Sequence, residues 1–228
     1  MNVRNLVLYE DNHLLVLNKP GGVLVQGDRT GDETLLQAAK QYIKEKYQKP
    51  GNVFLGLVHR LDRVTSGVVV LARTSKAAAR LSDAFRERKV RKSYLAVVHG
   101  TPREKEGLLE DQLSWDEKKR RAFVHRSGKP ARLRYRVLKS AGDKSLLLVV
   151  PETGRKHQIR AQLARAGHPI VGDLKYGSPK KIADGRAILL HAWRLDLPHP
   201  TRREEMTFEA PLPPYWPRKF LDKKDLLA

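Results

Sequence analysis

The segment that constrains this chain most is a polar stretch, residues 59–67 (His-Arg-Leu-Asp-Arg-Val-Thr-Ser-Gly), set between two apolar runs. Residues 53–58 precede it. Residues 68–72 follow it and have the length and the β-branched content of a buried strand. The chain therefore places one acid, Asp62, at the edge of a hydrophobic core. We expect Gly67 to supply the backbone freedom with which the loop enters the strand.

Asp62 has a basic residue on each side, Arg60 and Arg63. If either guanidinium folds back onto the carboxylate, the ionised form of Asp62 is favoured. An isolated aspartate in a loop more often caps a turn and pairs with an arginine than carries out catalysis. The residue by itself leaves both roles open.

The whole string of residues 59–67 resembles the signature of the RluA-type family of RNA pseudouridine synthases. The resemblance implies that Asp62 is the essential catalytic residue. It also implies that Arg60 fills the space vacated when the target uridine leaves its stack. His59 has two open roles, support of the loop and contact with RNA.

Two later segments carry the same resemblance. Residues 92–100 resemble the family segment whose tyrosine, here Tyr94, lies against the target base. Residues 151–160 resemble the family's third motif, in which the arginine corresponding to Arg160 pairs with the catalytic aspartate. Without the resemblance, a strand tyrosine is most often part of the core, and a helical arginine is usually a surface group.

Residues 18–22 break the preceding apolar strand with a proline and two glycines, and they resemble the family's first motif. From the residues alone two interpretations of Lys19 are open: it faces a phosphate or a carboxylate, or it is a solvated residue of a simple turn. We expect the second.

The charge balance predicts a polyanionic partner. The chain has 45 Lys and Arg against 25 Asp and Glu, a formal net charge of +20, which favours nucleic acid first and an anionic membrane surface second. Residues 118–139 contain ten basic residues and no acid. Within them, Arg132, Arg134 and Arg136 alternate with apolar residues, which puts them on one side of a strand, where we expect phosphate contacts from Arg132 and Arg134.

Several classes of protein are excluded or disfavoured. The chain has no cysteine, so disulfides and thiolate chemistry are excluded, and its eight histidines lack ligand spacing, so we expect no metal. No phosphate-binding loop or dinucleotide fingerprint occurs, and we expect no cofactor. The apolar runs are too short to span a membrane, and the first residues do not resemble a signal peptide. A cytoplasmic monomer with RNA as its partner and no membrane attachment is the expectation.

Short alternating strands recur along the chain, and three amphipathic helices are expected at residues 34–46, at residues 74–88 and before Gly167. This pattern predicts an α+β fold with a mostly antiparallel or mixed sheet. The resemblance, which extends over residues 8–213, implies the pseudouridine synthase fold with flanking helices and a central cleft. We expect residues 1–228 to form a single catalytic domain without a separate N-terminal RNA-binding domain.

The reaction implied by the resemblance is the isomerisation of uridine in ribosomal or transfer RNA to pseudouridine. Two other functions stay open at this point. A non-catalytic RNA-binding protein would keep the fold and bind without modifying RNA. A glycosidase-like hydrolase would need a second carboxylate that acts as a general acid, and no such partner is evident in the sequence.

Overall fold

The computed structural model describes residues 1–27, 31–202 and 204–220. They form two compact units. The first comprises Met1–Lys92 with Ala192–Leu212, and the second comprises Ser93–His191 with the segment that begins at Pro213. In the described part of the chain, no helix is both long enough and apolar enough to cross a membrane.

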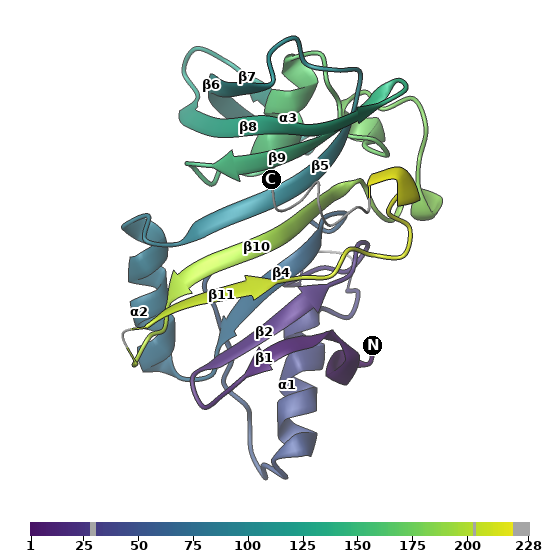
Figure 1. Ribbon diagram of the computed structural model, residues 1–228. Coiled ribbons are helices and arrows are strands. Elements are labelled where there is room, and N and C mark those ends of the chain that lie inside the picture. The colour runs from purple at the N-terminus through teal and green to yellow at the C-terminus, as the bar shows by residue number, and fades with distance from the viewer. Residues whose placement is uncertain (28–30, 203, 221–228) are drawn as a thin grey trace. The chain divides into compact units, whose positions relative to one another are not determined.

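The first unit is a sheet with two α-helices (Figure 1). Its elements are the 3-10 helix η1 (Val3–Leu6), the strands β1 (Val7–Glu10), β2 (Leu14–Lys19), β3 (Gly56–Leu57), β4 (Ser66–Ala72), β10 (Leu190–Pro198) and β11 (Glu205–Glu209), and the helices α1 (Leu35–Lys46) and α2 (Ser75–Arg86). Strand β10 enters this unit at Ala192. The strand order is β1-β2-β4-β10, with β3 beside β4 and β11 beside β10.

Burial and capping explain why these residues form these elements. All seven residues of β4 are buried, as its run of valines predicts. Helix α2 packs its small and apolar face, which includes Ala77 and Leu81, into the core with β2 and β4. Helix α1 begins at a capping box in which Thr34 and Gln37 bind each other's backbone N–H groups.

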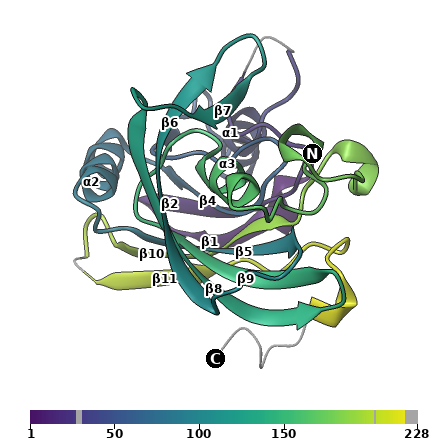
Figure 2. The ribbon, with the colours of Figure 1, turned by 90° about the horizontal axis from the view of Figure 1, so that it is seen from above.

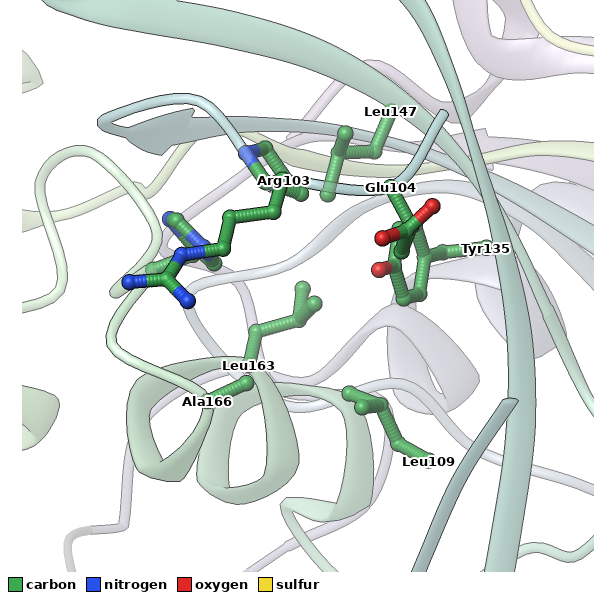
Figure 3. A pocket seen from close by; sticks show the side chains of 9 residues that line it. Arg103, Glu104, Leu109, Tyr135, Leu147, Leu163 and Ala166 are labelled. Atoms are coloured by element: carbon green, nitrogen blue, oxygen red, sulfur yellow. The ribbon is translucent and has the colours of Figure 1, made fainter. Parts of the chain in front are cut away.

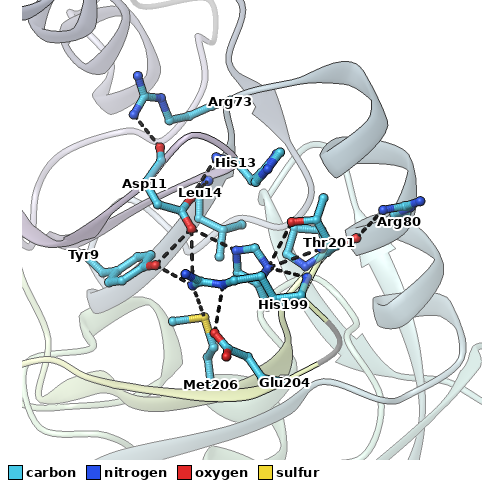
Figure 4. A network of polar contacts seen from close by, with 12 residues as sticks. Tyr9, Asp11, His13, Leu14, Arg73, Arg80, His199, Thr201, Glu204 and Met206 are labelled. Carbon is cyan, nitrogen blue, oxygen red and sulfur yellow. Dashed lines mark hydrogen bonds and ion pairs between the residues drawn. The ribbon is translucent and has the colours of Figure 1, made fainter.

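A partly buried polar network joins the β1–β2 turn to the β10–β11 turn (Figure 4). The carboxylate of Asp11 accepts hydrogen bonds from the backbone N–H groups of His13 and Leu14, both at 2.7 Å, and from the Tyr9 hydroxyl at 2.9 Å. The His199 ring, whose side chain is fully buried, lies 2.9 Å from the same carboxylate. Burial acts to raise the pKa of Asp11, but these hydrogen bonds outweigh it and lower the pKa to about 2.

The second unit is an antiparallel sheet in the order β5-β9-β8-β6-β7 with one α-helix. Its elements are β5 (Arg91–His99), which enters the unit at Ser93, β6 (Glu106–Asp116), β7 (Arg121–Val124), β8 (Lys129–Ala141), β9 (Lys144–Pro151), α3 (Gln158–Arg165), and the 3-10 helices η2 (Leu174–Tyr176), η3 (Ala183–Gly185) and η4 (Arg218–Phe220).

Helix α3 packs against β6, β7 and β8 in a small core of short side chains (Figure 2). This core contains Leu113, Ala122, Ala131 and Ala161, with Trp115 and Tyr176 packed against it. The α-helix begins after His157, which is in the left-handed conformation at φ 55° and makes no capping hydrogen bond through its side chain.

The predicted α+β fold is confirmed, and so are the three predicted helices, two of which are capped by threonines, Thr34 and Thr74. Arg132, Arg134 and Arg136 share the solvent side of β8, as their alternation predicted. The second helix ends at Arg86, two residues earlier than expected, because Arg88 takes a positive φ of 58°.

The loop that carries Asp62 enters β4 through Gly67, whose φ of +117° is closed to residues with a side chain. A Cβ atom at this position would lie 2.2 Å from the carbonyl oxygen of Ala192 on β10. The close approach of the two backbones therefore requires glycine for two independent reasons.

We expect Gly67→Ala to lower the free energy of unfolding by about 3 kcal/mol or more, because backbone strain and overpacking add. Urea unfolding followed by circular dichroism measures the change. Gly142→Ala is the matched control, since Gly142 has a φ of +63° but open space around it, and it should cost about 1 kcal/mol. Equal costs for the two variants would show that the contact with β10 is unimportant.

Candidate active site

Asp62 lies in an irregular loop between β3 and β4. The residue is partly exposed, while its neighbour Leu61 is only 7% exposed and packs inward. The backbone N–H of Thr65 donates to the Asp62 carbonyl at 3.1 Å and closes the turn. This turn presents a carboxylate at the surface of a loop that is anchored on both sides.

Lys19, at the end of β2, is fully buried beneath this loop. Its ammonium donates to the carbonyl oxygens of Pro20 at 2.9 Å, Val23 at 2.8 Å and Arg63 at 3.1 Å. Burial lowers the pKa of Lys19 to about 7, while the negative charge of Asp62 acts in the opposite direction. The expectation of a solvated lysine is wrong: the ammonium joins residues 19–23 to the Asp62 loop.

The guanidinium of Arg63 binds two other groups. Its Nε donates to the Gly22 carbonyl at 3.0 Å, and its Nη1 lies 2.8 Å from Asp32. The N–H of Gly22 donates back to the Arg63 carbonyl at 2.8 Å. Arg63 therefore fastens the loop to residues 19–23.

His59 supports the loop from the other side. Its Nε2 accepts a hydrogen bond from the backbone N–H of Val70 in β4 at 3.0 Å, and its ring stacks on Phe85 of α2 at a centroid distance of 4.9 Å. Burial, and to a lesser degree the charge of Lys92, lowers the pKa of His59 to about 3. The ring is thus neutral near pH 7, and these contacts favour the role of loop support. Contact with RNA stays a prediction.

In the second unit, Arg160 is buried at the first turn of α3, with 5% of its surface exposed. Its Nε lies 2.7 Å from Asp173 Oδ2 and its Nη2 lies 2.9 Å from Asp173 Oδ1. This bidentate pair compensates the buried charge and fixes the plane of the guanidinium. The further pairing predicted for Arg160, with Asp62, stays a prediction.

An aromatic ring covers the Arg160 guanidinium in the same unit. The ring of Tyr176 lies 5.0 Å from the guanidinium carbon. The Tyr176 hydroxyl accepts a hydrogen bond from the backbone N–H of Ala122 at 2.7 Å and lies 3.0 Å from Nδ1 of His157. The arginine is therefore held by a carboxylate at its edge and by a fixed ring at its face.

The other predicted site residues lie at the surface or near it. Tyr94 is partly exposed on β5 and is paired in register with Val149 of β9, and Arg60 is exposed. Arg132 and Arg134 are exposed on β8, and both form ion pairs with Glu152, at 3.3 Å and 2.8 Å. The predicted phosphate-binding face is thus partly neutralised by a neighbouring acid.

A pocket in the second unit lies between α3 and the sheet (Figure 3). Its lining is mainly apolar, from Leu109, Leu147 and Leu163, and none of the predicted site residues lines it. Burial, with the charge of Glu104, raises the pKa of Tyr135 at its edge, so that hydroxyl stays protonated. The polar lining of the pocket comes from Arg103, Glu104, Tyr135 and His168.

Sequence reasoning missed two residues that hold the site, Lys19 as a buried cation and Asp173 as the partner of Arg160. Lys19 stands two residues after the apolar run 14–17 and Asp173 directly follows residues 169–172, and these positions were the available signal. No group of three or more acidic or histidine side chains in the described residues is arranged to hold a metal ion.

Known proteins resemble this chain along most of its length. A family model described as RNA pseudouridylate synthase matches residues 13–165. The dual-specificity RNA pseudouridine synthase RluA of Escherichia coli is 39% identical over 209 residues, which cover 90% of this chain and 92% of that protein. The ribosomal large subunit pseudouridine synthase C of Buchnera aphidicola is 36% identical over 222 residues, covering 92% of this chain and 68% of the relative.

Solved structures give the same result. Human RNA pseudouridylate synthase domain containing 4 matches with a TM-score of 0.79 and 28% identity, covering 94% of this chain and 91% of that chain. Human RNA pseudouridylate synthase domain containing 1 matches with a TM-score of 0.71 and 30% identity, covering 91% and 83%. The chain belongs to the RNA pseudouridylate synthase family, and its enzyme class is RNA uridine isomerase.

The neutral state of His59 predicts how stability depends on pH. The pKa of this ring is lower in the folded chain than in the unfolded chain, so the unfolded chain binds the additional proton between pH 6.5 and pH 3. The free energy of unfolding should therefore fall as the pH drops through this window. By pH 5 the loss due to His59 should be about 2 kcal/mol.

We expect His59→Gln, which keeps an acceptor for the Val70 N–H but cannot titrate, to remove this part of the acid-side loss. Urea unfolding at pH 7 and pH 5 measures it. His125→Gln, at an exposed histidine, is the control and should leave the loss unchanged. If the two variants respond identically to pH, the buried ring is not the source.

Proposed function

We propose that this protein isomerises specific uridines in ribosomal or transfer RNA to pseudouridine, with Asp62 as the essential catalytic residue. The observation that carries the proposal is the anchoring of the Asp62 loop, in a chain of this family, by the buried ammonium of Lys19. The two classes of RNA are suggested by the relatives, one named as dual-specificity and one as acting on the large ribosomal subunit.

The reaction cuts the N-glycosidic bond of the uridine and joins the ribose to the uracil ring through carbon. In our proposal, Asp62 acts covalently or as a base at the ribose or the ring, and Tyr94 stacks on the base and takes part in the final removal of the proton from carbon. The base is both the leaving group and the attacking partner, and the proposal therefore needs no cofactor.

Arg160 is proposed to orient Asp62. The pair with Asp173 uses Nε and Nη2, and a guanidinium carries further donors on Nη1 that suit a second carboxylate. Arginine fits this role because it does not give up its own proton at any pH at which the enzyme works. Asp173 would then set the direction in which Arg160 offers those donors.

The target uridine has to leave its stack, at a cost of about a few kcal/mol, and targets in loops or bulges lower that cost. We propose that exposed Arg60 occupies the vacated space and that His59 keeps the Asp62 loop in place beside it. Arg132 and Arg134 are proposed to contact phosphate, with a contribution that their ion pairs to Glu152 reduce. The enzyme is proposed to act as a cytoplasmic monomer.

For Asp62→Asn we expect pseudouridine formation to fall by at least about 10³-fold, since the amide cannot act as nucleophile or base. Binding of RNA should persist, because the loop keeps its backbone contacts. Tritium release from labelled uridine in transcribed ribosomal and transfer RNA measures turnover. Asp83→Asn, at an exposed acid of α2, is the control. Retained turnover in Asp62→Asn would refute the assignment.

The proposed relation between Asp173 and Arg160 gives a second test. Arg160→Met should lower kcat about 10²- to 10³-fold. Asp173→Asn should lower it about 10²-fold through misplacement of the guanidinium. If Asp173 acts only through Arg160, Asp173→Asn in the Arg160→Met background should cost nothing more.

Stability provides the internal check on this cycle. Each single variant leaves one buried charge without its partner and should lower the free energy of unfolding by about 3–5 kcal/mol, while the double variant should recover part of the loss. Additive losses of kcat in the double variant would show that Asp173 has a separate role.

A further inference from the structure

The turn between β6 and β7 carries the densest group of cations in the second unit's sheet. Lys118, Lys119, Arg120 and Arg121 follow one another and are all exposed. Asp116 and Glu117 precede them, and Asp116 caps the turn by accepting the backbone N–H of Lys119 at 2.9 Å. The turn thus has four cations against two acids, at the tip of a hairpin.

Two segments distant in the sequence bring further cations to this hairpin. The ammonium of Lys156, which precedes α3, lies 3.4 Å from the centre of the Trp115 ring, and Trp115 is paired with Ala122 across the hairpin. The ammonium of Lys175 donates to the carbonyl of Arg120 at 3.1 Å. Three stretches of chain therefore contribute positive charge around one hairpin.

An exposed aromatic side chain lies on the other face of the hairpin from Trp115 and Lys156, because Trp115 faces the same way as its partner Ala122 and Phe123 is the next residue along β7. Phe123 is 38% exposed and stands two residues after Arg121 on β7, so both side chains are on the same face of the strand. Cations next to an exposed ring are the usual combination in proteins that bind single-stranded nucleic acid, because the cations contact phosphate and the ring stacks on a base.

The second unit has two basic surfaces, and they differ in whether their cations form ion pairs with carboxylates of the protein. On β8, Arg132 pairs with Glu110 and Glu152, and Arg134 pairs with Glu152. Among the residues that the structure describes, no carboxylate forms an ion pair with Lys118, Lys119, Arg121 or Lys156. Cations without a protein partner release more counterions from RNA, because no internal ion pair has to be broken first.

We propose that Lys118, Lys119, Arg121 and Phe123, here named the hairpin surface, bind a single-stranded segment of the substrate RNA, with the cations on its backbone and one base stacked on Phe123. This inference rests on the proposed function, which supplies an RNA with an unstacked uridine. The hairpin surface would add affinity and position the strand, and it would take no part in the chemistry at Asp62.

The charge test uses a triple variant, Lys118→Gln with Lys119→Gln and Arg121→Gln. Its dissociation constant for a fluorescein-labelled oligouridine is measured by anisotropy over a series of KCl concentrations. We expect the plot of log affinity against log salt to become less steep by about 2, since each lost phosphate contact on a single strand accounts for about 0.7. The control, Arg132→Gln with Arg134→Gln, should change the slope less.

The stacking test uses Phe123→Leu, which we expect to weaken binding of the same oligouridine about 5- to 100-fold without changing the salt slope. Phe123→Tyr keeps the ring and should bind as the wild type does. Thermal unfolding of each variant verifies that the hairpin is folded. At saturating RNA, kcat of the triple variant should match the wild type.

An unchanged slope in the triple variant, or a larger change in the β8 control, would overturn the hairpin surface as the principal contact. Equal binding by Phe123→Leu and the wild type would overturn the stacking role. Failure of the proposed function gives a different result: the wild type would form no pseudouridine in any RNA tested. The salt dependence of oligouridine binding would still show whether the hairpin surface contacts RNA.

Discussion

The position of Asp62 depends on a buried ammonium. Lys19 has no exposed surface, and an unpaired charge so placed would destabilise the fold by several kcal/mol. Three carbonyl oxygens accept hydrogen bonds from its ammonium, one of them that of Arg63 next to Asp62, and the Asp62 carboxylate supplies the nearby negative charge. A movement of the Asp62 loop that displaced the Arg63 carbonyl would remove one of the three acceptors of Lys19. The electrostatic requirement of the core thereby fixes the location of the acid.

The same principle operates in the second unit. Arg160 is buried against Asp173 in a bidentate pair, and Tyr176 covers the guanidinium. Arg160 is next to Ala161, which is part of the small core between α3 and the sheet, and Tyr176 packs against the same core. Charged groups held in this way need little reorganisation when a substrate binds. Fixed charges stabilise a transition state more effectively than water does, because water molecules have to reorient first. The two units thus prepare an acid and a cation independently of each other.

Much of the architecture could be predicted from the sequence because it depends on local patterns. The buried run of β4, the capping box of α1 at Thr34 and the alternation along β8 all follow from neighbouring residues. The resemblance over residues 59–67 singled out Asp62. The partners of Lys19 and Arg160 could not be found in this way, since they come from positions as far as 44 residues along the chain. Whether Lys19 is solvated or buried depends on which loop folds over it.

Net charge, like the local sequence patterns, does not identify which residues the fold brings together. A formal charge of +20 predicts a polyanionic partner but not the surface that binds it, because carboxylates compensate some cations and leave others. On β8, three aligned arginines make the more conspicuous pattern in the sequence, yet Glu110 and Glu152 lie beside two of them. The β6–β7 turn is a plain run of basic residues. What distinguishes it is that no carboxylate of the described residues forms an ion pair with Lys118, Lys119 or Arg121, which only the fold reveals. Attraction to RNA is therefore a property of the whole chain, while the place of binding is a property of its ion pairs.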